Sequence, residues 1–291
     1  MTAADLASGK GDTDENFPVA SVLIARRFRA PVLAFYRFAR IADDVADHPT
    51  AQPSQKLALL AQMRASLVGE SELSAEGVAL RRVLAERGLA PQHALDLLEA
   101  FRRDVTKLRT VDWDDLMDYC RYSAMPVGRF VLDVHGESRD TWPANDALCA
   151  ALQVINHLQD CAKDYRDLNR VYLPMDMLEK ESLSLEALRQ ARSSPALRAV
   201  LSELARRTQR LLNASRPFAS QIRNRRLSLN VSVIQTLAED LTARLLVRDP
   251  LSDRVHHRKS ELPLLLLRAA GRFASARLGP KRSGTEPRTA P

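Results

Sequence analysis

A stripe of charged and aromatic side chains between Tyr36 and His48 has the clearest chemical character in the sequence. Asp43 and Asp47 lie four residues apart in a segment typical of a helix, so both carboxylates project from one helical face. Arg40 precedes Asp43 by about one turn, and Tyr36 precedes Arg40 by about one more. One face of this helix therefore presents an aromatic ring, a cation and two anions.

A second acidic stripe lies between Asn156 and Asp167. Asn156, Asp160 and Asp164 follow one another at a spacing of four residues, which places their oxygen atoms on one helical face. If the two helices face each other, these groups form a cage of hard oxygen ligands, the kind that holds Mg2+ against a diphosphate. Either stripe alone is more typical of a solvated charged face, so the prediction depends on their pairing.

The departure of a diphosphate from carbon requires that its developing negative charge be neutralised, which Mg2+ and basic side chains do without proton transfer. The carbocation left behind must be shielded from water by apolar walls. Phe35, Phe38 and Phe130 suit such walls, although aromatic residues at helical spacing more often form an ordinary core. Tyr119 and Tyr122 carry hydroxyls that either enter the cavity or lie at its rim. No Gly-rich phosphate loop, zinc helix or nucleophile elbow competes with this interpretation.

Composition predicts an all-α protein. The chain has 291 residues, of which 45% are hydrophobic and only 10 are Gly, and it lacks long strand-like alternation. We expect one domain over residues 16–278, with disordered segments at 1–15 and 279–291. Neither a signal peptide nor a membrane span is apparent. The cysteines lack metal-type spacing and are odd in number, which predicts reduced thiols in a cytoplasmic protein.

Prolines set several of the expected helix bounds. We expect one helix to begin at Pro31 and to end near Pro49. A longer helix, from Trp113 to His135, contains Pro126, which predicts a kink and a close backbone approach among the small residues near it. Further helices are expected at residues 16–25, 53–68, 76–87, 91–109, 143–165, 195–224, 229–247 and 262–278, and an extended segment at 170–174.

The net charge of +7 is concentrated near the C-terminus. Nine Lys or Arg and two Asp or Glu lie from Arg254 onward, so the rest of the chain is neutral by count. This distribution argues against a nucleic-acid-binding protein. Beside the apolar run Leu262–Leu267, the cations predict weak, salt-sensitive contact with the inner membrane. A solubilising tail over a core helix is the equally weighted alternative.

Three motifs, in this order, resemble those of the squalene/phytoene synthase family. The first is Tyr-x-x-x-Arg-x-x-Asp-Asp-x-x-Asp at residues 36–47. The second begins at Gln153, contains the acidic stripe and is followed by Arg170-x-Tyr172-x-Pro174. Between them, Tyr-Cys-Arg-Tyr-Ser-Ala-x-Pro-Val-Gly at 119–128 is similar to the family's mid-chain cavity helix. The resemblance covers most of the chain, from about residue 16 to the region of residue 258.

Within this family, residues 15–21 and the run Phe101–Lys107 look like the bacterial hydroxysqualene synthases of hopanoid biosynthesis. The resemblance implies a helical isoprenoid-synthase fold around a central cavity. It also implies Mg2+-dependent ionisation of presqualene diphosphate, rearrangement, and quenching by water to hydroxysqualene. The metal ligands implied are Asp43, Asp47, Asn156, Asp160 and Asp164. The catalytic set adds Tyr119 to the four aspartates, and the substrate-binding set is Tyr36, Arg40, Asn16, Phe17, Tyr122, Ser123, Ala124, Gly128, Gln153, Arg170 and Tyr172.

Two alternative functions stay open at this point. Another enzyme of the family, a prenyltransferase, would make presqualene diphosphate, squalene or phytoene from two prenyl diphosphates. A catalytically inactive helical protein would instead serve as an assembly partner of pathway enzymes. The intact set of five oxygen ligands argues against an inactive protein.

Overall fold

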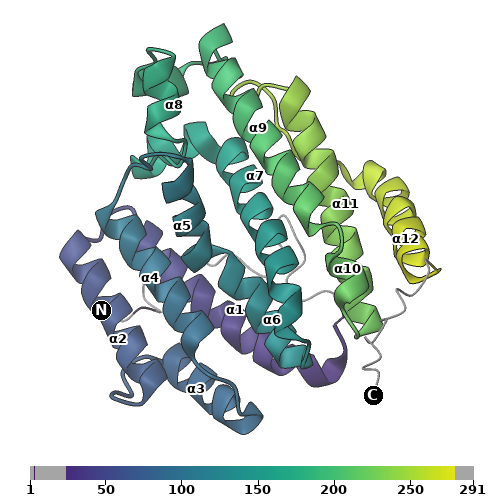
Figure 1. Ribbon diagram of the computed structural model, residues 1–291. Helices are drawn as coiled ribbons and strands as arrows, with labels where there is room; N and C mark the ends of the chain where they lie inside the picture. The colour runs from purple at the N-terminus through teal and green to yellow at the C-terminus, as the bar shows by residue number, and fades with distance from the viewer. Residues whose placement is uncertain (1–2, 4–23, 279–291) are drawn as a thin grey trace, which may run out of the picture.

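The computed structural model describes residue 3 and residues 24–278, and within them all regular elements are helices (Figure 1). This confirms the predicted all-α class. An isolated bridge between Arg109 and Val171 is the only β-type pairing in the described part. The α-helices are α1 Arg26–Asp47, α2 Pro53–Val68, α3 Ala75–Arg87, α4 Gln92–Thr106, α5 Trp113–Ser123, α6 Met125–His135, α7 Trp142–Leu168, α8 Met175–Lys180, α9 Pro195–Ser215, α10 Phe218–Gln221, α11 Arg225–Val247 and α12 Leu262–Leu278.

Helices α1 to α4 pack together around one hydrophobic cluster, which includes the fully buried Phe38, Met63 and Leu80. The prediction that a helix begins at Pro31 was wrong, because α1 begins at Arg26 and contains this proline. Most of the helix predicted at 16–25 lies outside the described residues. Proline lacks the N–H that would bond to the carbonyl oxygen of Arg27. That oxygen instead accepts a hydrogen bond from the Arg87 side chain at 2.8 Å, so the helix tolerates the proline.

The other half of the molecule is a layer in which α7, α9 and α11 lie side by side and α12 covers the outer side of α11 (Figure 1). A second hydrophobic cluster fills it, with Ile155, Leu158 and Leu197 fully buried. The predicted single helix over 195–224 was wrong. The observed helix α9 ends at Ser215 because Pro217 cannot continue it, and the short helix α10 follows.

The predicted kinked helix over 113–135 is in fact two helices, α5 and α6, which meet at Ala124. Pro126 lies in the first turn of α6, the position in which proline is best tolerated. The predicted close approach is present at Gly128, where an added Cβ would lie 2.0 Å from the side-chain oxygen of Asn145 on α7. Phe35 of α1 stacks on Phe130 of α6 with ring centroids 4.0 Å apart. The start of α6 is therefore held between α1 on one side and α7 on the other.

Candidate active site

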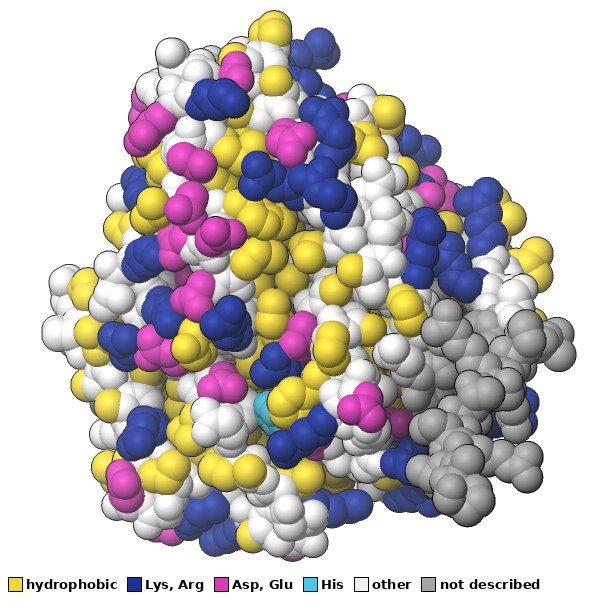
Figure 2. Space-filling view, in the orientation of Figure 1, with side chains coloured by type: hydrophobic (Ala, Val, Ile, Leu, Met, Phe, Trp, Pro, Cys, Tyr) yellow, Lys and Arg dark blue, Asp and Glu magenta, His cyan; other side chains and the backbone are white. Residues whose placement is uncertain are grey.

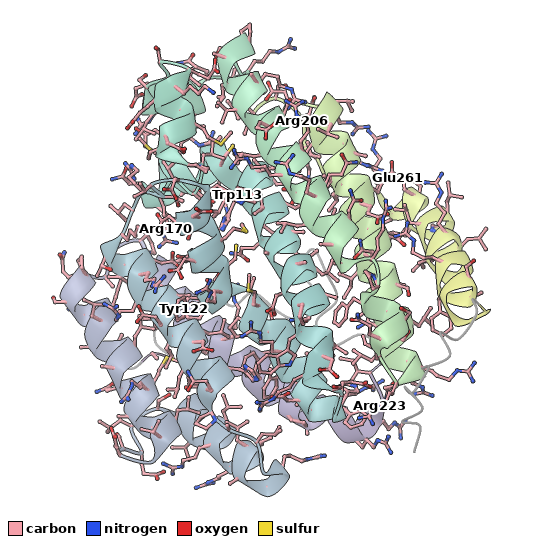
Figure 3. All side chains as sticks on the ribbon, viewed as in Figure 1. Trp113, Tyr122, Arg170, Arg206, Arg223 and Glu261 are labelled. Carbon is pink, nitrogen blue, oxygen red and sulfur yellow. The ribbon has the colours of Figure 1, made fainter. Side chains whose placement is uncertain are left out.

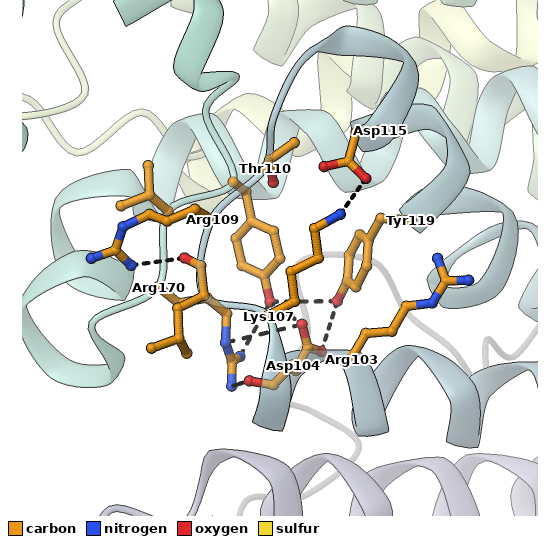
Figure 4. A pocket seen from close by; sticks show the side chains of 11 residues that line it. Arg103, Asp104, Lys107, Arg109, Thr110, Asp115, Tyr119 and Arg170 are labelled. Atoms are coloured by element: carbon orange, nitrogen blue, oxygen red, sulfur yellow. Dashed lines mark hydrogen bonds and ion pairs between the residues drawn. The ribbon is translucent and has the colours of Figure 1, made fainter.

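Two short extended segments bring the ends of α4 and α7 together. The Val171 N–H donates to the Leu108 carbonyl at 2.9 Å, and the Thr110 N–H donates to the Val171 carbonyl at 3.1 Å. The expected extended segment at 170–174 is confirmed. The expected continuation of α4 to residue 109 was wrong, because residues 108–110 pair with this segment instead. The pairing places the side chain of Arg170 beside Asp104 (Figure 4).

Arg170 connects the first acidic motif to the loop that follows the second one. Its Nη1 donates to Asp47 Oδ1 at 2.8 Å and to the Tyr172 hydroxyl at 3.2 Å, while Nη2 donates to the Asp104 carbonyl at 3.1 Å. The side chain is only 6% exposed. Burial lowers its pKa, but the surrounding oxygens, led by those of Tyr172 and Asp104, outweigh this and raise the pKa above its already high value. Arg170 is thus a permanent cation at this site.

Asp104 is a site residue that the sequence analysis did not select. It accepts hydrogen bonds from the hydroxyls of Tyr119 and Tyr172, each at 2.8 Å. Burial raises the pKa of Asp104 to about 6, although Arg170 and the two hydroxyls favour its charged form. The run Phe101–Lys107 contains this residue, but nothing in the run distinguishes it from its charged neighbours. Only the pairing of residues 108–110 with 171 identifies it.

The same environment keeps two hydroxyls and one imidazole neutral. Burial and the Asp104 carboxylate raise the pKa of both Tyr119 and Tyr172 well above the usual tyrosine value. The ring of His157 stacks on that of Tyr172 with centroids 3.7 Å apart. Burial, assisted by Arg170, lowers the pKa of His157 to about 3. Tyr119, Tyr172 and His157 therefore offer hydrogen-bond donors and acceptors at the site but add no charge to it.

The acidic residues of both motifs are close enough to affect one another. Burial, followed by the Asp47 charge, raises the pKa of Asp43 to about 7. Burial and the Asp160 charge raise the pKa of Asp164 to about 7, and the Asp47 charge also contributes. Arg40 opposes this effect at Asp43, which it contacts at 3.1 Å. The charge of the first motif therefore acts on the second motif.

Within residues 24–278, no three acidic, His or Cys side chains converge tightly enough to hold a metal ion by themselves. Asp47 is held by Arg170, and Arg40 contacts both Asp43 and Asp44. The donor set is nevertheless of the type that a divalent cation prefers. Its carboxylates repel one another, which is the electrostatic imbalance that such a cation relieves.

The remaining predicted site residues fall into different surroundings. The Tyr122 ring lies under the Arg103 guanidinium at 4.1 Å, Gln153 contacts His157 at 3.2 Å, and the buried Ser123 Oγ has no hydrogen-bond partner among the described residues. Tyr36 and Asn156 are partly exposed, Ala124 is buried at the junction of α5 and α6, and Gly128 packs against α7. Asn16 and Phe17 lie outside the described residues.

Basic groups that the sequence analysis did not select lie beside each motif. Lys56 donates to the Ala46 carbonyl at 2.9 Å, and the charges of Arg170 and Asp47 act on its pKa, which burial lowers. Beside the second motif, the Gln159 side chain donates to the Val255 carbonyl. The adjoining loop lines a cavity of about 560 Å3 with Arg248, Asp253, Arg254, His256, His257 and Arg258.

One face of the molecule is hollowed (Figure 2). Hydrophobic side chains line it, with acidic side chains gathered along one side and basic ones along the other (Figure 2). Arg170 and Tyr122 lie beside α4 and α5, whereas Glu261 lies at the start of α12 on the far side of α11 (Figure 3). None of the helices described is both long and apolar enough to cross a membrane.

Known proteins with this architecture share sequence over almost the whole chain. The chain is 58% identical to the hydroxysqualene synthase of Rhodopseudomonas palustris, over 88% of this chain and 87% of that protein. It is 55% identical to the hydroxysqualene synthase of Zymomonas mobilis, over 94% of each. Among solved structures, squalene synthase HpnC from Alicyclobacillus acidocaldarius superposes with a TM-score of 0.70 at 32% identity, covering 84% of this chain and 91% of that one.

The model of one protein family, squalene/phytoene synthase, matches residues 11–261. This range contains both acidic motifs, the α5–α6 junction and the extended segment after α7. The chain belongs to the squalene/phytoene synthase family.

Proposed function

We propose that the protein is a hydroxysqualene synthase, an enzyme that converts presqualene diphosphate and water to hydroxysqualene and diphosphate. The observation that carries this proposal is the identity of more than half, over nearly the full length, to enzymes of that name. The site is compatible with this chemistry because it combines carboxylates with a fixed cation.

The residues that would hold Mg2+ are Asp43, Asp47, Asn156, Asp160 and Asp164. Bound there, Mg2+ would neutralise the charge that develops on the departing diphosphate. The raised pKa values of Asp43 and Asp164 support this assignment, because burial and a neighbouring aspartate disfavour the charged carboxylates and a bound cation would favour them. Coordination requires the deprotonated carboxylates, so metal affinity should rise with pH up to about 7.

Fixed cations of the chain itself would assist the departure of the diphosphate. Arg170 is buried, permanently charged and held by Asp47 and Asp104, so it needs little reorganisation. Arg40 and Lys56 add positive charge on the side of α1 and α2. Arg254 adds positive charge from the loop after α11, in which the charges of Arg254 and Asp160 both act on the pKa of His256.

A carbocation formed at the site would then have to meet one water molecule and not bulk solvent. The Tyr119 hydroxyl is already committed to Asp104, and the Tyr122 ring is covered by Arg103. Ser123 has a buried hydroxyl with no partner among the described residues, which makes it our candidate for positioning that water. The departed diphosphate can accept the proton that the water loses.

The test supplies purified protein with presqualene diphosphate and Mg2+ in oxygen-18 water, without a nicotinamide reductant. The proposal predicts a C30 alcohol that carries the label, together with one diphosphate per alcohol formed. Farnesyl diphosphate alone should give no product. Accumulation of presqualene diphosphate from farnesyl diphosphate would instead show a sister enzyme, and a C30 hydrocarbon formed only with reductant would show a squalene synthase.

Variants with single substitutions provide the controls for this test. Asp43→Asn and Asp160→Asn should each lower turnover by at least about a hundredfold, since each weakens the neutralisation of the leaving group. Circular dichroism should stay unchanged, because both side chains are partly exposed. Asp114→Asn, an exposed acidic residue in the first turn of α5, should retain full activity. Normal turnover by both site variants would contradict the assignment of the site.

A further inference from the structure

The outer side of α12 carries a cluster of exposed leucines. Nine large hydrophobic side chains are exposed in the described part of the chain, and four of them lie within Leu262–Leu267. Leu264 is 55% exposed and Leu267 is 70% exposed. Val247, at the end of α11, is 80% exposed. A concentration of exposed apolar groups on one element is typical of an interaction surface and not of random surface composition.

These leucines are not the ones that attach α12 to the protein. Leu265 and Ala269, four residues apart, are buried on the side where α12 packs against α10 and α11. Leu264 and Leu267 are three residues apart and project from the opposite side of the helix. Gly271 and the small residues near it are exposed there as well. The helix therefore has one face in the core and a second apolar face in solvent.

Basic residues surround this second face. No acidic residue lies between Leu262 and Leu278, and Glu261, just before the helix, contacts Arg244 at 3.0 Å. Arg268 is exposed beside the leucines, and Arg258 and Lys259 are exposed at the start of the helix. Apolar side chains bordered by cations match the surface of an anionic bilayer, which offers acyl chains beneath negatively charged headgroups.

We propose that the outer face of α12, formed by Leu264 and Leu267 with Arg258, Lys259 and Arg268 at its edge, docks on an anionic lipid bilayer. A second copy of the chain is a poorer occupant, because it would bring two basic edges together. The segment 279–291 is also a poor candidate to bind this face of α12, since it contains no large apolar side chain.

The position of this face relative to the site indicates that docking would help to deliver a lipid substrate. The loop between α11 and α12 lines the basic cavity and contacts α7 through Gln159 and Val255. A bilayer against α12 would thus lie beside the loop that lines the basic cavity and contacts α7 next to Asp160. A lipid diphosphate could pass from the membrane along basic residues without crossing bulk water.

The test is co-sedimentation of the full chain with vesicles of phosphatidylcholine alone and of phosphatidylcholine mixed with phosphatidylglycerol. The proposal predicts binding to the mixed vesicles at low salt and its loss at high salt. The double variant Leu264→Ser/Leu267→Ser should bind at least about tenfold more weakly. Arg268→Gln should bind about fivefold more weakly, the equivalent of about 1 kcal/mol for one cation at the surface.

A matched control is Leu73→Ser, which removes a leucine that is 68% exposed on another part of the surface. It should bind as the unaltered protein does, and thermal unfolding should show that every variant is folded. Absence of vesicle binding, or equal binding by the double variant, would overturn the proposal. So would a change in oligomeric state in the double variant without any effect of lipid, because the face would then be a protein interface.

Discussion

Asp104 shows how strongly one residue depends on contacts that are distant in the sequence. Its carboxylate accepts from two tyrosine hydroxyls, one on α5 and one after α7, and it lies 4.0 Å from the Arg170 side chain. The acidic stripes were predictable because helical spacing alone places their carboxylates on common faces. The partners of Asp104 lie 15 to 68 residues away along the chain, so no local pattern predicts them.

The raised pKa of Asp104 predicts a specific dependence of stability on pH. Its value of about 6, against the usual 3.8, means that the folded protein keeps this proton to higher pH than the unfolded chain. The associated stability is fully present below about pH 4 and is lost as the pH rises through about 6. Relative to Asp104→Asn, the free energy of unfolding of the unaltered protein should fall by about 2 kcal/mol over this range.

Urea denaturation of both proteins at a series of pH values measures this difference. The asparagine retains one acceptor for the tyrosine hydroxyls, so the comparison isolates the titration from the loss of the side chain. Curves that stay parallel from about pH 4 to about pH 7 would contradict the raised pKa of this carboxyl.

At the scale of elements, prolines were only partial guides to where and how a helix is disturbed. Pro126 correctly predicted a disturbance in residues 113–135, yet the outcome is two helices and not one kinked helix. Pro31 was wrongly taken as a helix start, because the carbonyl it leaves without a partner is satisfied by Arg87 from α3. Whether a proline breaks a helix therefore depends on tertiary contacts that the local sequence does not contain.

The contact between α6 and α7 provides a test at the same scale. Gly128→Ala should destabilise the protein by about 1–3 kcal/mol, because the new methyl group would overlap with Asn145 and lie 2.7 Å from the sulfur of Cys149. Gly271→Ala is the matched control, since it lies in α12 with nothing within 4 Å of an added Cβ. It should stabilise the protein by up to about 1 kcal/mol. Thermal unfolding of both variants measures the contrast, and equal effects would contradict the packing described.

At the scale of the whole molecule, the all-α fold was predicted from sequence, whereas the loops beside the candidate site were not. Helical composition and period were sufficient for the all-α class. Both loops act through contacts between segments far apart in the sequence. Residues 108–110 pair with Val171 and so hold Arg170 beside Asp104, and the loop at 248–258 lines the basic cavity. The helix scaffold is thus encoded locally, and the charges that complete the site are encoded by the packing.

The central claim is that α1 and α7 contribute to one divalent-metal site that acts on a diphosphate. The most direct measurement is the binding of Mn2+, as a substitute for Mg2+, in the presence of inorganic diphosphate, followed by electron paramagnetic resonance. Asp43→Asn and Asp160→Asn should each weaken binding by at least about tenfold. Relative to the unaltered protein, the double variant should lose much less affinity than the product of the two single losses, as expected for ligands of one site. Binding should persist in Asp114→Asn. Unchanged binding in either single site variant, or effects of the two substitutions that simply multiply, would contradict a single site shared by the two helices.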